Sequence, residues 1–260
     1  MPNLLVADNQ VEYEQTGAGQ DLILLPTLLA EMTVYDEVID YLSRQFRVTR
    51  INFPGFGSSL GPIGQTIESY ADLTAATMKA LLLPTDAHLV GNGFGGFVAS
   101  TLAIRHGVSF DKLVLVDTGA GFPEPAKEAL RVLANKAINE GMNSVLDAAI
   151  KRMFPEDFIV ENPSIMNRRR HYLAQADPSL FANAALALTF LDNRPKLSEI
   201  NNPTLIVVGL ADATTPPALS YELKAGISGS ILQELPQIGH CPQLQDPTAF
   251  LNAVVPFLNS

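Results

Sequence analysis

The sequence of 260 residues contains no tryptophan, one cysteine and four histidines. The single cysteine, Cys241, excludes an internal disulfide. Positive charge is also scarce, because 17 Lys and Arg residues stand against 27 Asp and Glu residues, for a formal net charge of -10. Nucleic acids and anionic membranes both favour basic surfaces, so this balance argues against either as a partner.

Signals for export, membrane insertion and metal binding are missing as well. The first eight residues have no basic segment and only a short apolar run, unlike a secretory signal peptide. No apolar stretch approaches the roughly 18 residues of a membrane span. His, Cys and Asp do not cluster at metal-ligand spacing, so no metal site is expected. We expect a soluble, cytoplasmic protein.

What the sequence does have is apolar material, at 47% of residues against 17% charged, enough for one sizeable core. Apolar runs alternate with stretches of helical spacing, which predicts a mostly parallel sheet covered on both faces. The expected strands include residues 11–16, as an edge strand, and 22–25, 47–53, 89–90, 112–116, 204–208 and 231–235. The expected helices are 34–46, 67–82, 94–105 and 247–258.

The segment 121–200 interrupts this alternation with helical patterns alone. These patterns cover residues 126–140, 142–153, 163–174 and 178–191. We therefore expect a core made of residues 1–120 and 201–260, with 121–200 inserted as a helical cap. Such a cap would lie over the carboxyl edge of the sheet, where ligands bind in open α/β folds.

The stretch Gly91-Asn92-Gly93-Phe94-Gly95 has the form of a nucleophile elbow, G-x-S-x-G, with glycine in place of serine. An apolar strand leads into it and a helical pattern follows. The small residues allow that helix to approach the strand closely. The pattern predicts a sharp strand-to-helix turn at Gly93, without the hydroxyl that usually stands there.

The order of motifs resembles the α/β-hydrolase superfamily over essentially the whole chain. The cap and the C-terminal third are most similar to the enol-lactonase and carbon–carbon-bond hydrolase branch. The features that carry this similarity are Glu140-Gly141-Met142, residues 202–209 and Gly239-His240. The resemblance implies a mostly parallel eight-stranded sheet with helices on both faces and an inserted helical cap.

In that superfamily the triad follows the chain order nucleophile, acid, histidine. The matching positions are Gly93, Asp212 and His240. The resemblance implies that Asp212 holds His240 Nδ1 and that Nε2 faces Gly93 across a gap the size of a hydroxymethyl group. Asp117 is a reserve acid, although a turn role is preferred for it. Cys241 is disfavoured as a substitute nucleophile, because adjacent residues on a loop usually point apart.

Two further motifs depart from the family pattern. Pro26-Thr27-Leu28 stands where relatives have His-Gly and an oxyanion donor, which assigns the donor role to the backbone N–H groups of Leu28 and Phe94. Thr27 adds a hydroxyl that tightens or crowds the site, and Thr27 and Asn92 are expected to contact substrate. Residues 52–59 resemble a structural loop of the family, with Asn52 replacing the usual aspartate.

Other polar residues have simpler interpretations. His88 and His106 flank the elbow elements and favour structural or surface roles. Arg168-Arg169-Arg170, followed by His171, is typical of a solvated basic helix face, and attraction of an anionic substrate is the alternative. Gly91, Gly93 and Gly96 match the dinucleotide pattern G-x-G-x-x-G, but no acidic residue ends the next strand at the expected distance of about 20 residues, since Asp117 lies a few residues further on. No cofactor is therefore expected.

Three explanations fit a glycine at the nucleophile position. The chain is an engineered Ser-to-Gly trap, or a native divergent enzyme in which His240 acts as base on water or substrate, or a ligand-binding protein. The several departures favour the native enzyme. Hydrolysis of a small carbonyl compound (ester, lactone or C–C bond) ranks first, and a cofactor-free lyase, isomerase or oxygenase second. The expected partner is that small substrate in a mostly apolar pocket, on a monomer or homodimer.

Overall fold

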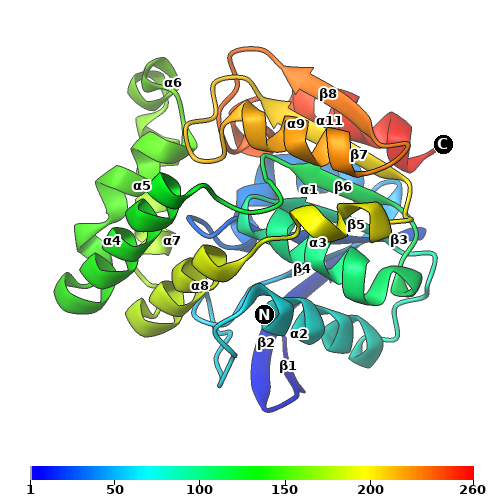
Figure 1. Ribbon diagram of the computed structural model, residues 1–260, viewed down its shortest axis with the longest axis horizontal. Coiled ribbons are helices and arrows are strands. Elements are labelled where there is room, and N and C mark those ends of the chain that lie inside the picture. The colour runs from blue at the N-terminus through cyan, green and yellow to red at the C-terminus, as the bar shows by residue number, and fades with distance from the viewer. Residues whose placement is uncertain (1) are drawn as a thin grey trace.

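A single eight-stranded sheet organises the computed structural model, which describes residues 2–260 (Figure 1). Its strand order is β1-β2-β4-β3-β5-β6-β7-β8, with β1–β2 and β2–β4 antiparallel and the other pairs parallel. The strands are β1 (Asn3–Val6), β2 (Asn9–Thr16), β3 (Gln20–Leu25), β4 (Phe46–Ile51), β5 (His88–Asn92), β6 (Leu113–Val116), β7 (Thr204–Gly209) and β8 (Ile231–Leu235). The expected mostly parallel eight-stranded sheet is confirmed.

The central strands are continuous apolar runs because helices cover both of their faces. Every residue of β5, β6 and β7 is buried. In contrast, the edge position expected for residues 11–16 is wrong, since β2 lies between β4 and the exposed β1. Residues 3–6 are short and mostly solvent-facing, so they carry little apolar signal.

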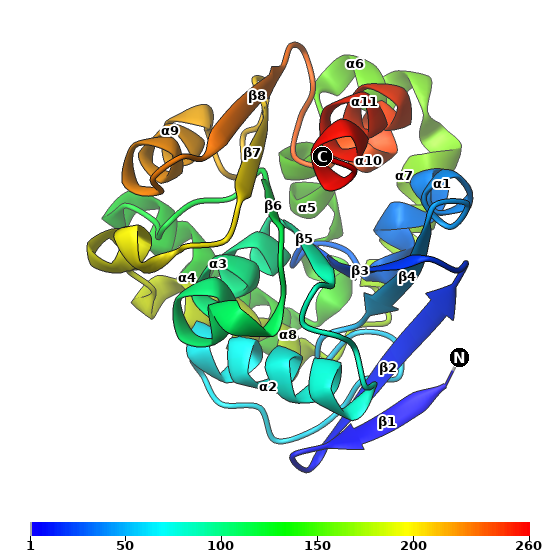
Figure 2. The same ribbon diagram turned by 90° about the vertical axis from the view of Figure 1, so that its right-hand side faces the viewer.

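The helices of the core form two layers, one on each face of the sheet (Figure 2). One layer contains α2 (Ile67–Ala80), α3 (Phe94–His106) and α9 (Pro217–Gly226). The other contains α1 (Asp36–Leu42), α10 (Pro242–Gln245) and α11 (Pro247–Leu258). The helix expected over 34–46 is shorter, because a 3-10 turn occupies Met32–Tyr35 and Phe46 already belongs to β4.

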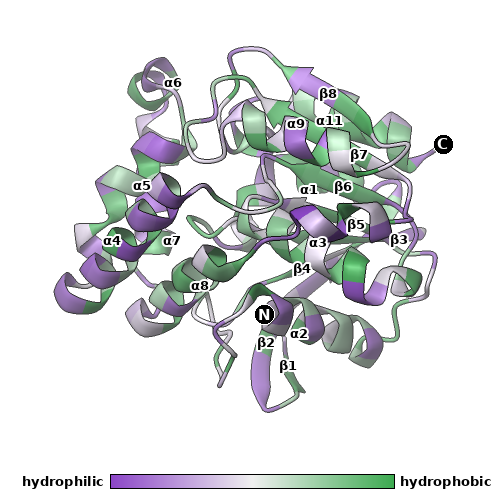
Figure 3. Ribbon diagram, viewed as in Figure 1, coloured by the Kyte–Doolittle hydropathy of each residue, from purple (hydrophilic) through white to green (hydrophobic). Residues whose placement is uncertain are grey.

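Five helices lie between β6 and β7 in the chain and gather beside one end of the sheet (Figure 1). They are α4 (Glu124–Glu140), α5 (Leu146–Met153), α6 (Glu156–Glu161), α7 (Pro163–Leu173) and α8 (Pro178–Phe190). Helix α8 is mostly hydrophobic, whereas α4 carries many hydrophilic residues (Figure 3). The difference follows from packing, since α8 contacts both α4 and α2. No helix within residues 2–260 is long and apolar enough to cross a membrane.

Of the three consecutive arginines of α7, only Arg169 leaves the solvated basic face, whereas Arg168 and Arg170 stay partly exposed. Arg169 is buried, and its guanidinium lies 3.4 Å from the Glu31 carboxylate and donates to Thr33 Oγ1 at 2.7 Å. Arg168 pairs with Glu37 of α1 at 2.7 Å, and Arg170 with Asp147 of α5 at 3.2 Å. The solvated interpretation is therefore wrong for Arg169, because the loop after β3 supplies a carboxylate that the sequence pattern does not reveal.

Candidate active site

Gly93 occupies the turn between β5 and α3, with φ +52° and ψ -115°. Residues with a side chain rarely adopt this backbone conformation. In a nucleophile elbow, the nucleophile stands on a strained turn of this kind. Strand and helix cross closely here. A Cβ on Gly91 would lie 2.3 Å from the Gly95 carbonyl oxygen, and one on Gly95 would lie 2.4 Å from that of Leu25.

Asp212 and His240 lie on the loops that follow β7 and β8, and their side chains are hydrogen-bonded. His240 Nδ1 is 2.8 Å from Asp212 Oδ2, and both side chains are almost fully buried. The other carboxylate oxygen accepts the backbone N–H groups of Thr214 and Thr215, at 2.7 and 3.2 Å. The fixed carboxylate selects the ring form with hydrogen on Nδ1, which leaves Nε2 free to accept a proton.

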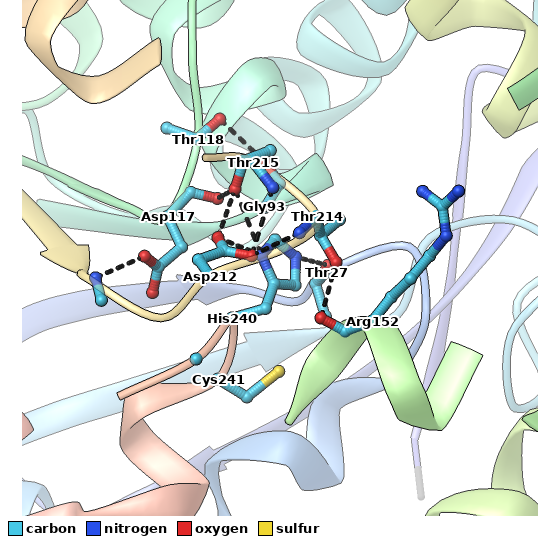
Figure 4. Close-up of polar contacts among 12 residues, drawn as sticks. Thr27, Gly93, Asp117, Thr118, Arg152, Asp212, Thr214, Thr215, His240 and Cys241 are labelled. Carbon is cyan, nitrogen blue, oxygen red and sulfur yellow. Dashed lines mark hydrogen bonds and ion pairs between the residues drawn. The ribbon is translucent and has the colours of Figure 1, made fainter. Parts of the chain in front are cut away.

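Thr27 fills the space in which the sequence predicted a gap. Its Oγ1 is 2.9 Å from His240 Nε2, and Figure 4 shows Thr27 and Asp212 bonded to opposite sides of the imidazole. A Cβ built on Gly93 would lie only 2.3 Å from this oxygen. The hydroxymethyl-sized gap is therefore not present. The sequence did carry a signal for this contact. Compared with the family pattern, a hydroxyl is missing at position 93 and an additional one is present at position 27.

Leu28 and Phe94, the expected oxyanion donors, both line the cavity that Thr27 and His240 line. Phe94 is the first residue of α3, where an N–H has no partner within the helix. Neither N–H donates to another of residues 2–260. Their role as oxyanion donors stays a prediction.

These groups open into a cavity of about 30 Å³, roughly the room for one small group beside the imidazole. Residues from the sheet edge and from helices α4, α5 and α8 share its wall. Its lining is mostly apolar: Leu28, Leu29, Phe94, Phe97, Phe122, Leu130, Leu133 and Leu188, with Thr27, Gly93, Arg152, Thr214, Thr215 and His240. Arg152 is its one cationic side chain.

Asn92, expected to contact substrate, does not line this cavity. Its side-chain Nδ2 donates to the His240 carbonyl oxygen at 2.9 Å, and Oδ1 accepts from Gln243 Nε2 at 3.0 Å. Both bonds fix the loop that carries His240. Asn92 therefore supports the loop that carries His240, and its expected substrate contact stays a prediction.

Asp117, the reserve acid, and Cys241, the disfavoured substitute nucleophile, do not line the cavity. Asp117 is fully buried and accepts from the Gly209 N–H at 2.7 Å. Burial, and then the nearby Asp212 charge, raise the pKa of the Asp117 carboxyl well above its usual range. Burial likewise raises the pKa of the Cys241 thiol, which lies on the other side of His240 from Gly93 (Figure 4). A buried neutral thiol is a poor nucleophile.

The remaining histidines, His88, His106 and His171, all lie outside the cavity. His106 Nε2 pairs with Asp72 at 2.7 Å, and His171 with Gln175 at 2.8 Å. Throughout residues 2–260, no three His, Cys, Asp or Glu side chains group in a way that could hold a metal ion.

Known proteins resemble this chain along nearly all of its length. A family model described as the alpha/beta hydrolase family matches residues 22–254. The chain is 28% identical over 254 residues to 3-oxoadipate enol-lactonase 2 of Acinetobacter baylyi, covering 96% of this chain and 94% of the relative. It is 28% identical over 257 residues to a pimeloyl-[acyl-carrier protein] methyl ester esterase of Aeromonas hydrophila, covering 95% and 99%.

Among solved structures, the enol-lactonase from Burkholderia xenovorans LB400 superposes with a TM-score of 0.95. It is 28% identical to this chain, and the match covers 100% of both chains. The expected resemblance to the enol-lactonase branch is therefore confirmed.

Proposed function

The chain belongs to the alpha/beta hydrolase family and is a hydrolase of that fold, and we propose that it hydrolyses a small carboxylic ester or lactone with His240 as general base. One observation carries this proposal. The hydrogen-bonded series Asp212–His240–Thr27 lies at an apolar cavity that Leu28 and Phe94 also line, and the backbone N–H groups of these two residues donate to no other of residues 2–260.

Each part has a role in acyl transfer. Asp212 orients the imidazole and stabilises the positive charge that forms when Nε2 takes a proton from the attacking O–H group. As the carbonyl carbon becomes tetrahedral, negative charge develops on its oxygen. The N–H groups of Leu28 and Phe94 would donate hydrogen bonds to that oxygen, and the apolar wall would strengthen them by excluding water.

Arg152 indicates the class of substrate. Its guanidinium forms no ion pair with any carboxylate in the described part of the chain, and Figure 4 shows it extending away from His240. An unpaired cation in an apolar wall suits a substrate carboxylate, held at a distance from the reacting carbonyl. The name of the Acinetobacter relative, which refers to 3-oxoadipate, supports an anionic substrate.

The test is a panel of small esters and lactones, each with and without a free carboxylate. His240→Gln removes the base, so we expect kcat/KM to fall by roughly 10²–10⁴-fold on every substrate. Arg152→Gln is expected to raise KM for the carboxylate members only. His171→Gln, on the outer side of α7, is the matched control and should leave turnover unchanged. Equal turnover by wild type and His240→Gln would reject His240 as the base, and absence of turnover in both would favour a binding protein.

A further inference from the structure

We propose that the Thr27 hydroxyl is the nucleophile of this hydrolase, so that the reaction passes through an acyl-threonine. The proposal rests on the proposed function, because it uses the same base. Thr27 Oγ1 lies 2.9 Å from His240 Nε2, and the Asp212 carboxylate, 2.8 Å from Nδ1, favours the ring form with hydrogen on Nδ1. Nε2 is then the acceptor, and the threonine hydroxyl must be the donor. This is the hydrogen bond that activates a hydroxyl nucleophile.

The register of the sheet explains how Thr27 reaches this point. Strands β3 and β5 are parallel neighbours, and Leu25 pairs with Gly91. Two residues further along each chain, position 27 stands beside position 93. The ideal Cβ of residue 93 would be 2.3 Å from Thr27 Oγ1, so one place near Nε2 is available to either residue and not to both. Here the threonine occupies it.

The same exchange preserves the oxyanion donors. In the elbow arrangement, one donor is the N–H of the residue after the nucleophile and the other comes from the loop after the neighbouring strand. With Thr27 as nucleophile, the residue after it is Leu28, and the neighbouring loop supplies Phe94. The two donors are therefore the same pair, and both residues line the cavity with Thr27.

The hydrogen bonding of Thr27 differs from that of the buried structural threonines. Thr74, Thr77 and Thr101 each donate to the carbonyl four residues earlier in a helix, at 2.8 Å. Thr27 Oγ1 contacts the base alone among residues 2–260.

The chemistry balances with water as the second reactant. Thr27 Oγ1 forms a bond to the carbonyl carbon while its proton moves to His240 Nε2, and the carbonyl electron pair moves to oxygen. When that pair returns, the bond to the leaving oxygen breaks, and His240 gives this oxygen the proton. Water then attacks the acyl-threonine by the same steps, which releases the acid and restores the hydroxyl.

The experiment locates the nucleophile with a small alkyl fluorophosphonate, which forms a stable phosphonyl ester with loss of fluoride. Wild type, Thr27→Ser, Thr27→Val and His240→Gln are treated, digested and mapped by mass spectrometry, and hydrolysis of p-nitrophenyl acetate is measured in parallel. We expect wild type to be labelled at Thr27, and Thr27→Ser at the new serine. Thr27→Val should stay unlabelled, with kcat/KM lower by about 100-fold or more.

The outcomes separate this proposal from the one on which it rests. If Thr27→Val hydrolyses the ester as wild type does, or if label sits on another residue, the nucleophile role is overturned, while His240-dependent turnover would still support direct attack by water. Turnover that His240→Gln leaves unchanged would instead reject the proposed function. Should Thr27→Val fail to fold, the position of the label in wild type and Thr27→Ser decides.

Discussion

At the scale of single residues, the site depends on side chains whose neighbours come from distant parts of the chain. The triad order and the elbow placed Gly93, Asp212 and His240 in one hypothesis from sequence alone. The direction of the Thr27 side chain could not be predicted in that way, because it depends on how two neighbouring strands are aligned. The hydrogen bonds of Asn92 could not be predicted for the same reason, because its partners lie on the loop after β8 and on α10.

Asp117 gives a residue-scale prediction about pH. Its pKa is raised by burial, so the folded protein retains a proton that the unfolded chain loses near pH 4. This contribution to stability is complete below the unfolded pKa and is lost as pH rises toward the folded pKa. Asp117→Asn keeps an oxygen for the Gly209 N–H and removes the titration. We expect the variant to gain stability relative to wild type between pH 5 and pH 8, as measured by urea unfolding.

The matched control for that series is Asp147→Asn, an exposed carboxyl on α5. The unfolding free energy of this variant should differ little from that of wild type at every pH. If the unfolding free energies of wild type and Asp117→Asn differ by the same amount at every pH, the Asp117 carboxyl is not held neutral by burial.

At the scale of elements, the long periodic segments were predicted well and the short ones poorly. Residues 204–208 and 247–258 match β7 and α11 closely, because apolar periodicity over a full strand or several helical turns is a strong signal. The expected helix over 142–153 divides into a 3-10 turn and the shorter α5, and α6 was not predicted. These short segments contain too few residues to show a helical period in the sequence, and tertiary packing holds them in place.

Helix α7 provides the element-scale prediction. Arg169→Met removes the cation and leaves the Glu31 carboxyl buried without it, at a site where burial already raises the pKa of that group. Breaking a buried pair on one side costs about 3–5 kcal/mol of unfolding free energy. Arg170→Met, next in sequence and paired with exposed Asp147, should cost at most about 1 kcal/mol. Both variants are measured by urea unfolding. Equal losses of unfolding free energy would show that the buried Arg169 contacts do not stabilise the packing of α7 on the core.

At the scale of the whole molecule, fold and family followed from the sequence, whereas the reacting group did not. Alternating strands and helices with one helical insertion define the fold class. We propose that helices α4 to α8 act as the cap of the site, since Leu130, Leu133, Arg152 and Leu188 line the cavity together with His240. The monomer-or-homodimer expectation and the cellular location stay predictions.

The central claim is that positions 27 and 93 share one place for a side chain beside His240. A double-mutant cycle tests it most directly, with Thr27→Gly, Gly93→Ser and the combined variant assayed on p-nitrophenyl acetate. Gly93→Ser alone brings its Cβ to 2.3 Å from Thr27 Oγ1 and to 2.5 Å from His240 Nε2, and Thr27→Gly alone lacks the hydroxyl. We predict that each single variant loses on the order of 100-fold in kcat/KM. The combined variant removes the contact with Thr27 and leaves only the one with the imidazole, so we expect it to recover part of that loss.

Thermal unfolding of all four proteins controls for folding in this cycle. The contradicting result is specific. If Gly93→Ser alone hydrolyses the ester faster than wild type while Thr27→Gly has no effect, the two positions are independent, and Gly93 is simply an elbow that has lost its serine.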